Sequence, residues 1–191
     1  MNKKILAITL ALLVCGVAAA QSKKGKSAET APVVDEWNDV EVFEQHKLYP
    51  RANVIPYGDE NAIEKNAYAE SPYYVSLNGE WRMMLKSSFD SRPANIEQKD
   101  FSAEGWPTVI VPNARLYDGN KPVQAKKIYA PSDISSTKNW VATYYKEFDV
   151  PKTWKDYKAY LNLQAKSAYY VWVNQEYVGY SEDSRDLSEF D

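Results

Sequence analysis

The sequence has few of the residues that build metal centres and nucleophilic triads. Its 191 residues include one cysteine, Cys15, and one histidine, His46. A histidine-based zinc site needs several ligands, and a Ser-His-Asp triad would have to use His46. The seven glycines form neither a phosphate-binding loop nor a dinucleotide-binding fingerprint. We therefore expect His46 to be a solvated or hydrogen-bonded residue without a catalytic role.

The first 20 residues have the three-part pattern of a secretory signal peptide. A basic start precedes an uncharged, mostly apolar run over residues 5–14, and the small residues Ala18–Ala20 follow. The apolar stretch is shorter than the roughly 20 residues that span a bilayer, which favours cleavage over a membrane anchor. Cys15 fits a lipoprotein site poorly, because the bulky Val14 precedes it. We expect an exported, periplasmic or extracellular protein with no membrane attachment after cleavage.

Cleavage of this signal peptide would leave a mildly acidic chain without cysteine. The formal net charge would change from −3 to −5, because Lys3 and Lys4 would be removed. Such a chain can form no disulfide or thiolate metal site, and its acidity argues against nucleic acid as a partner. Aromatic residues are abundant, with 15 Tyr, 6 Trp and 5 Phe. They suit sugar-binding surfaces, which need flat apolar faces with polar tips, but sandwich cores use the same residues.

The chain after the signal peptide divides into three regions. Residues 21–34 are polar and small, as in a flexible tether, and residues 35–70 are predicted to be an extended N-terminal arm. Residues 71–191 carry short β-forming runs separated by turns, which favours an all-β, antiparallel β-sandwich. The predicted strands cover residues 73–77, 80–85, 106–111, 141–150, 157–164, 168–173 and 176–180. The long segment 113–136 is predicted to be a loop.

The acidic residues do not suggest a catalytic pair. Glycoside hydrolysis uses two carboxylates that flank the same bond. Glu182 and Asp183 are adjacent, and in an extended segment neighbouring side chains point to opposite faces. They could not both face one sugar, so we assign no catalytic residue to this chain.

Several sequence blocks resemble the sugar-binding domain of bacterial β-galactosidases of glycoside hydrolase family 2. The blocks are GYSEDSR at 179–185 with EFD at 189–191, SAYYVWVN at 167–174, LNGEW at 77–81, VPN at 111–113, and the arm runs around 37–42 and 50–57. They occur in the order found in that family and extend over nearly all of the chain after residue 20. Each block alone is weak, but the set is specific.

The resemblance implies a jelly-roll-like sandwich that continues beyond residue 191, so that its last strands would be missing here. Members of the family add immunoglobulin-like domains and a TIM barrel with two catalytic glutamates. A TIM barrel alone needs about 200 residues, more than this chain could supply. The resemblance thus implies an N-terminal carbohydrate-binding segment of a β-galactosidase, which hydrolyses terminal β-D-galactosides. Its expected partners are a β-galactoside and the remaining domains of the parent enzyme, and alone it should be inactive.

Two residues are candidates for contact with the sugar. In the family, the aspartate of the GYSQDSR motif hydrogen-bonds sugar hydroxyls and helps to hold sodium, and its match here is Asp183. An asparagine of the VPSNW motif also contacts substrate, and Asn113 is its nearest match, although the pattern here is one residue shorter and lacks the Trp. No cofactor is expected in this chain itself. Sodium could bind through Asp183 together with the absent domains, and magnesium would bind only in the missing catalytic domain.

Two other readings of the sequence stay open. One is a freestanding exported carbohydrate-binding module or glycan receptor without enzymatic activity. Such a module should close its own sandwich, because an open sheet edge invites aggregation. The other is a structural β-sandwich that binds nothing, which would leave Asp183 and the long loop without a purpose. Tyr170 and Trp172 are expected in the core under every reading.

Overall fold

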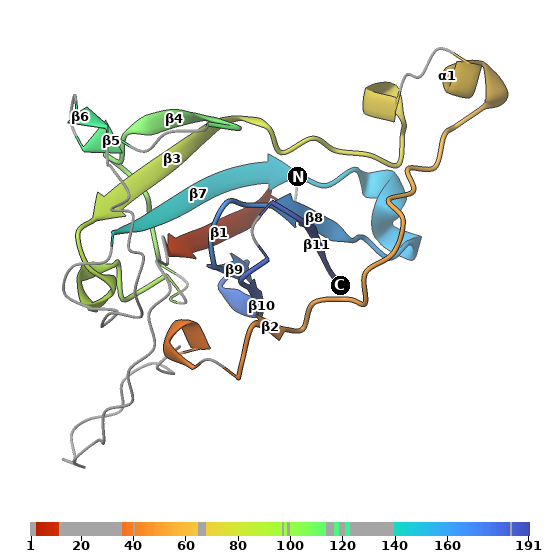
Figure 1. Ribbon diagram of the computed structural model, residues 1–191. Helices are drawn as coiled ribbons and strands as arrows, with labels where there is room; N and C mark the ends of the chain where they lie inside the picture. The colour runs from red at the N-terminus through yellow and green to blue at the C-terminus, as the bar shows by residue number, and fades with distance from the viewer. Residues whose placement is uncertain are drawn as a thin grey trace.

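Strands are the main regular elements in the part of the chain that the structure describes (Figure 1). The computed structural model describes residues 3–11, 36–39, 41–64, 68–96, 98, 100–113, 117–118, 121–122, 140–183 and 185–191. The strands are β1 (Lys3–Ala11), β2 (Glu44–Gln45), β3 (Gly79–Lys86), β4 (Thr108–Val111), β5 (Tyr117–Asp118), β6 (Lys121–Pro122), β7 (Val141–Asp149), β8 (Leu161–Gln164), β9 (Tyr169–Val173), β10 (Glu176–Ser181) and β11 (Leu187–Phe190). The described residues also form a short α-helix, α1 (Glu60–Glu64), and four separate 3₁₀ turns: η1 (Glu36–Asn38), η2 (Tyr68–Glu70), η3 (Phe89–Ser91) and η4 (Lys152–Asp156).

The strands form an antiparallel sandwich, as the sequence predicts. The main sheet has the order β2-β10-β9-β1-β7-β3-β4, and each neighbouring pair is antiparallel. The strands β8 and β11 form a separate two-stranded sheet, and β5 pairs with β6. None of the described helices is long and apolar enough to cross a membrane.

Strand β9 is buried on both of its faces. Alternate residues of a strand point to opposite sides, so its unbroken run of apolar residues serves two hydrophobic clusters. Tyr169 and Val171 belong to one cluster, and Tyr170 and Trp172 belong to the other. All four side chains are at most 2% exposed. The expectation that Tyr170 and Trp172 are core residues is therefore confirmed.

Each face of the main sheet has its own cover. The β8–β11 pair covers the face of Tyr169 with Leu161, Leu163 and Phe190. The opposite face is covered by the connection between β3 and β4, which contributes Phe89, Ile96 and Phe101, and by Trp37. The indole of Trp37 lies 4.9 Å from the ring of Phe89, centroid to centroid. The arm and the β3–β4 connection therefore complete the core.

Strands β9 and β10 form the hairpin that leads into the GYSEDSR motif. Its two turn residues, Asn174 and Gln175, have φ angles of 51° and 68°. Two-residue hairpins of type I′ need positive φ at both positions, which is why Asn-Gly is usual there. Gln175 thus adopts a conformation that glycine would enter more easily, and the predicted hairpin still forms.

Two parts of the chain differ from the sequence prediction, and in a third the structure does not describe the residues. Residues 73–77 form no strand. Instead the Tyr74 amide donates to the Ser71 carbonyl in a turn, 3.2 Å away. Lys3–Ala11, expected within the signal peptide, forms β1 in the middle of the main sheet. The tether at 21–34 and most of the loop at 113–136 lie outside the described residues.

Candidate functional site

Asp183 lies in the short connection between β10 and β11, at the end of the main sheet where β10 finishes. Its side chain is 36% exposed, so the carboxylate can be reached from solvent. Its backbone N–H donates to Ser181 Oγ at 3.2 Å. The buried Ser181 hydroxyl in turn lies 3.1 Å from Ser188 Oγ on β11. These contacts tie the connection to both strands and fix where the carboxylate emerges.

Lys47 of the arm is the partner of this carboxylate. Its ammonium donates to Asp183 Oδ2 and lies 2.9 Å from Glu44 Oε2. The Lys47 side chain is only 5% exposed, whereas both carboxylates remain partly in solvent. Burial alone lowers the Lys47 pKa, but the hydrogen bonds and charges of Asp183 and Glu44 outweigh it, so the pKa lies above its usual value. Lys47 is therefore a permanent cation at the edge of the site.

The arm reaches Asp183 because it runs along β10 and β11. Strand β2 pairs with the end of β10, with Gln45 opposite Tyr180. The Glu182 amide donates to the Phe43 carbonyl at 2.9 Å, and the Leu48 amide donates to the Glu189 carbonyl at 2.8 Å. These backbone bonds set the path of the arm and bring Lys47 beside the motif.

Gly179, the first residue of the GYSEDSR motif, allows this close approach. A Cβ atom at this position would lie 2.6 Å from the Gln45 carbonyl oxygen and 2.6 Å from the Phe190 ring. Any side chain would push the arm or β11 away. A glycine inside a strand often marks such an approach of another backbone, and the motif gives that signal in sequence.

Glu182 and Asp183 face different partners. Glu182 Oε1 accepts a hydrogen bond from the Tyr180 hydroxyl, whereas Asp183 pairs with Lys47. Burial, followed by this hydrogen bond, raises the pKa of Tyr180 above its usual range. The two adjacent carboxylates therefore have separate hydrogen-bond partners.

Asn113 lies far from Asp183 in the sheet. It is exposed and follows β4, which forms one edge of the main sheet, whereas β10 is next to the opposite edge. The two also lie at opposite ends of the strands. The pairing can be followed from strand to strand: the end of β10 lies in the same row of the sheet as Leu85 of β3, with β9, β1 and β7 between them. The end of β4 pairs with Gly79 of β3. Six residues of strand separate these rows, about 20 Å, so the described structure does not bring the two candidates together.

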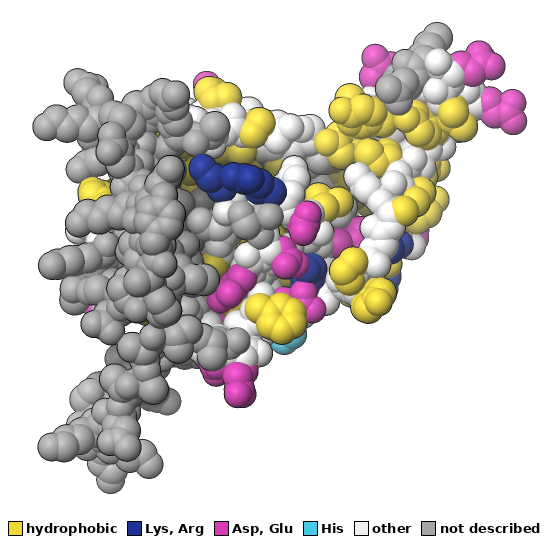
Figure 2. Space-filling model, in the orientation of Figure 1, with side chains coloured by type: hydrophobic (Ala, Val, Ile, Leu, Met, Phe, Trp, Pro, Cys, Tyr) yellow, Lys and Arg dark blue, Asp and Glu magenta, His cyan; other side chains and the backbone are white. Residues whose placement is uncertain are grey.

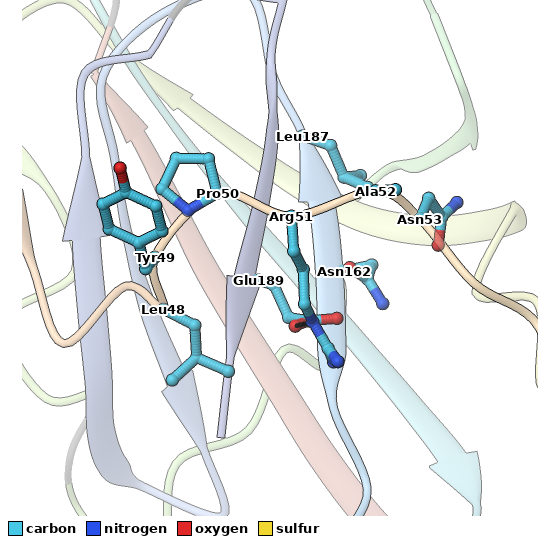
Figure 3. Close-up of a pocket in the computed structure, with 9 residues that line it drawn as sticks. All are labelled: Leu48, Tyr49, Pro50, Arg51, Ala52, Asn53, Asn162, Leu187 and Glu189. Atoms are coloured by element: carbon cyan, nitrogen blue, oxygen red, sulfur yellow. Dashed lines mark hydrogen bonds and ion pairs between the residues drawn. The ribbon is translucent and has the colours of Figure 1, made fainter.

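A shallow pocket lies where the arm crosses the β8–β11 pair (Figure 3). Arg51 reaches across it, with its Nε 2.6 Å from Glu189 Oε1. The guanidinium also lies 4.9 Å from the centroid of the Tyr160 ring. Arg51 is more than half exposed, so we interpret this cluster as an attachment of the arm to the sandwich.

Metal-binding groups are sparse in the parts of the chain that the structure describes. No cluster of three or more His, Cys, Asp or Glu side chains occurs among those residues. Asp183 offers a hard oxygen ligand, but the Lys47 ammonium occupies one side of it. Sodium binding through Asp183 stays a prediction. The exposed His46 has its ring 5.6 Å from that of Tyr177 and joins no such cluster.

Lys47 is the residue that sequence reasoning missed. Its partner Asp183 is 136 positions away, and no motif links the two. Glu44 and Lys47 are three residues apart, a spacing that predicts a contact only on a helix. This part of the arm is not helical, so the spacing does not predict their ion pair. Only the pairing of β2 with β10 reveals the contact.

Known proteins match the chain over the same sandwich. Residues 74–191 match the family described as glycosyl hydrolases family 2, sugar binding domain. The β-galactosidase of Priestia megaterium is 35% identical over 183 residues, and the match covers 88% of this chain and 18% of that protein. The β-galactosidase of Halalkalibacterium halodurans is 32% identical, with 80% and 16% covered, and the β-galactosidase large subunit of Leuconostoc lactis is 30% identical, with 81% and 28% covered. The chain thus spans less than a third of the length of these relatives. It belongs to glycoside hydrolase family 2 and carries that family's sugar-binding domain.

Proposed function

We propose that this chain is the carbohydrate-binding segment of an exported β-galactosidase that hydrolyses terminal β-D-galactosides. In this proposal the chain contributes Asp183 to the sugar site, and the remaining domains of the parent enzyme supply the catalytic groups. The observation that carries the proposal is the partly exposed Asp183 carboxylate within the matched domain, held by Lys47, whose side chain is largely shielded from solvent. Export is supported by the sequence pattern of residues 1–20 alone.

The pairing with Lys47 fits a role in holding a sugar. A carboxylate accepts strong hydrogen bonds from hydroxyl groups, and its two oxygens can accept from several donors. Because Lys47 engages Oδ2 from the arm side, it limits the rotation of the Asp183 side chain. A fixed carboxylate loses less entropy when a sugar binds. Sodium would bind here only with further oxygen ligands from the rest of the enzyme. Asn113 stays a second candidate contact, but it carries none of this argument.

A chimeric enzyme tests the role of Asp183 in the full reaction. This chain would replace the matching segment of the Priestia megaterium β-galactosidase, and turnover of a chromogenic β-galactoside would be measured. We expect Asp183→Asn to lower kcat/KM about 10- to 100-fold, the cost of a lost hydrogen bond from a charged group.

The matched control is Asp186→Asn, an exposed aspartate in the same connection. It should leave kcat/KM unchanged within about twofold. Equal effects of the two variants, or no effect of Asp183→Asn, would contradict the proposal. The isolated chain, assayed in parallel, is expected to show no turnover.

A further inference from the structure

Phe43 of the arm is an exposed aromatic residue beside the GYSEDSR motif. Its side chain is 58% exposed. Its carbonyl oxygen accepts a hydrogen bond from the Glu182 amide at 2.9 Å, which extends the pairing of β2 with β10 by one residue beyond Glu44 and Ser181. A single exposed apolar side chain is common on protein surfaces. This ring is of interest because of the polar group that lies next to it.

The carboxylate of Glu182 shares a face of the sheet with the Phe43 ring. Residues opposite each other in an antiparallel pair point to the same side, with their Cβ atoms about 5 Å apart. Tyr180 lies two residues before Glu182, is fully buried, and donates its hydroxyl proton to Glu182 Oε1. This bond holds the carboxylate in place while Glu182 remains partly exposed. A flat apolar ring and a fixed hydrogen-bond acceptor therefore lie side by side at the edge of the main sheet.

The neighbouring carboxylates of Glu182 and Asp183 are held in the same way. In each case a shielded donor engages the carboxylate, Tyr180 for Glu182 and Lys47 for Asp183. Adjacent side chains of an extended segment point to opposite faces, so the two carboxylates cannot contact the same sugar ring. They can contact successive rings of one sugar chain, because the two residues are neighbours in sequence.

We propose that Phe43 and Glu182 form a second sugar contact, which binds the pyranose unit attached to the galactose at Asp183. The apolar C–H face of this pyranose lies against the phenyl ring, and one of its hydroxyls donates to the Glu182 carboxylate. The inference rests on the proposed function, because it requires galactose to bind at Asp183. It narrows the substrate class to β-galactosides whose leaving group is itself a sugar.

A titration of the full chain with two galactosides tests the proposal. The probes are lactose, whose leaving group is glucose, and methyl β-D-galactoside, which has no second ring. NMR would follow the ring signals of Phe43 and the backbone amide of Asp183, and would give the dissociation constant of each probe. We expect both probes to shift the Asp183 amide and only lactose to shift the Phe43 ring. Lactose should bind about three- to tenfold more tightly than methyl β-D-galactoside.

Substitutions at the proposed contact sharpen the test. Phe43→Ala should remove the advantage of lactose and leave the dissociation constant of methyl β-D-galactoside unchanged. Phe43→Trp keeps an aromatic face and should keep the advantage, whereas Glu182→Gln weakens the acceptor and should reduce it. The matched control is Tyr49→Ala, which removes a 92% exposed ring elsewhere on the arm and should change neither dissociation constant.

The outcomes separate this inference from the proposed function. The inference is overturned if lactose leaves the Phe43 ring signals unchanged up to its solubility limit, or if Phe43→Ala weakens both probes equally. A shift of the Asp183 amide without a shift of the Phe43 ring would overturn the second contact and leave the proposed function supported. A shift of the Phe43 ring that Asp183→Asn leaves unchanged would contradict the role of Asp183 and support the contact at Phe43.

Discussion

The centre of the main sheet and the arm use the same aromatic residue in opposite ways. Tyr170 on β9 is fully buried and lies 4.6 Å from the Tyr180 ring, centroid to centroid. Tyr49 on the arm is 92% exposed, and Val54 is 76% exposed. Hydrophobic side chains gather on the surface of the part of the arm near α1, at the right of Figure 2. Composition alone therefore cannot separate a core tyrosine from an exposed one.

The difference shows where the stability of the chain resides. The sheet is held by burial of large side chains, which contributes in proportion to apolar area. Trp37 anchors the start of the arm in the core, whereas the rest of the arm is held by a few polar contacts, above all β2 with β10 and Lys47 with Asp183. Substitutions should thus be costly in the sheet, moderate at the Lys47 contact and neutral at exposed arm residues.

The largest expected difference in stability is between a core substitution in the sheet and an exposed substitution on the arm. Trp172→Ala removes a 2% exposed side chain from the core and should lower the free energy of unfolding by about 3–5 kcal/mol. Tyr49→Ala on the arm should change it by no more than about 0.5 kcal/mol. Urea denaturation of both variants measures the difference. Similar losses would show that the arm is as tightly packed as the sheet.

Alkaline pH should weaken the sheet before it affects the arm. Burial raises the pKa of Tyr144, and burial together with a hydrogen bond to Glu147 raises that of Tyr145, each to about 12. The unfolded chain ionises its tyrosines near pH 10, so between about pH 10 and 12 the folded state holds more protons and loses stability as the pH rises. For Tyr144 the loss should be on the order of 2 kcal/mol.

Denaturation at pH 9 and pH 12 measures this loss, and Tyr144→Phe should reduce it. Tyr49→Phe, at an exposed position, should leave the loss unchanged. A loss that is insensitive to Tyr144→Phe would mean that other groups govern the alkaline response.

The smallest expected effect concerns the contact between the two regions. Lys47→Met keeps the buried stem but removes the charge that two carboxylates share, and should cost about 1–2 kcal/mol. Lys158→Met breaks the exposed ion pair with Asp191 and should leave the unfolding temperature almost unchanged. Thermal unfolding of both variants tests the ranking, and an equal cost would mean that Lys47 behaves as a surface residue.

The sequence predicts the sheet better than it predicts the site. The dense β-forming run of 168–173 was sufficient to predict the β9–β10 hairpin and the core positions of Tyr170 and Trp172, because these features depend on local patterns. The contact of Lys47 with Asp183 depends on how a long extended arm crosses the sandwich, which no local pattern encodes. Residues 73–77 have strand-like composition but form no strand, and their first two amides, those of Tyr73 and Tyr74, donate to Ser71 instead.

The position of β1 could not be predicted for a related reason. An apolar, β-branched segment with a basic start satisfies both the signal-peptide pattern and the requirements of a central strand. The pattern is read from the first 20 residues, whereas the strand position depends on pairing with β7 and β9, at least 130 positions away.

A galactose titration of the purified chain tests most directly whether its carboxylate contacts sugar. Calorimetry should detect binding with a dissociation constant on the order of millimolar, because the rest of the site is supplied by other domains. Binding should disappear in Asp183→Asn and persist in Asp186→Asn. A tight isotherm, or one that Asp183→Asn leaves unchanged, would contradict the assignment of Asp183 as the sugar contact of this domain.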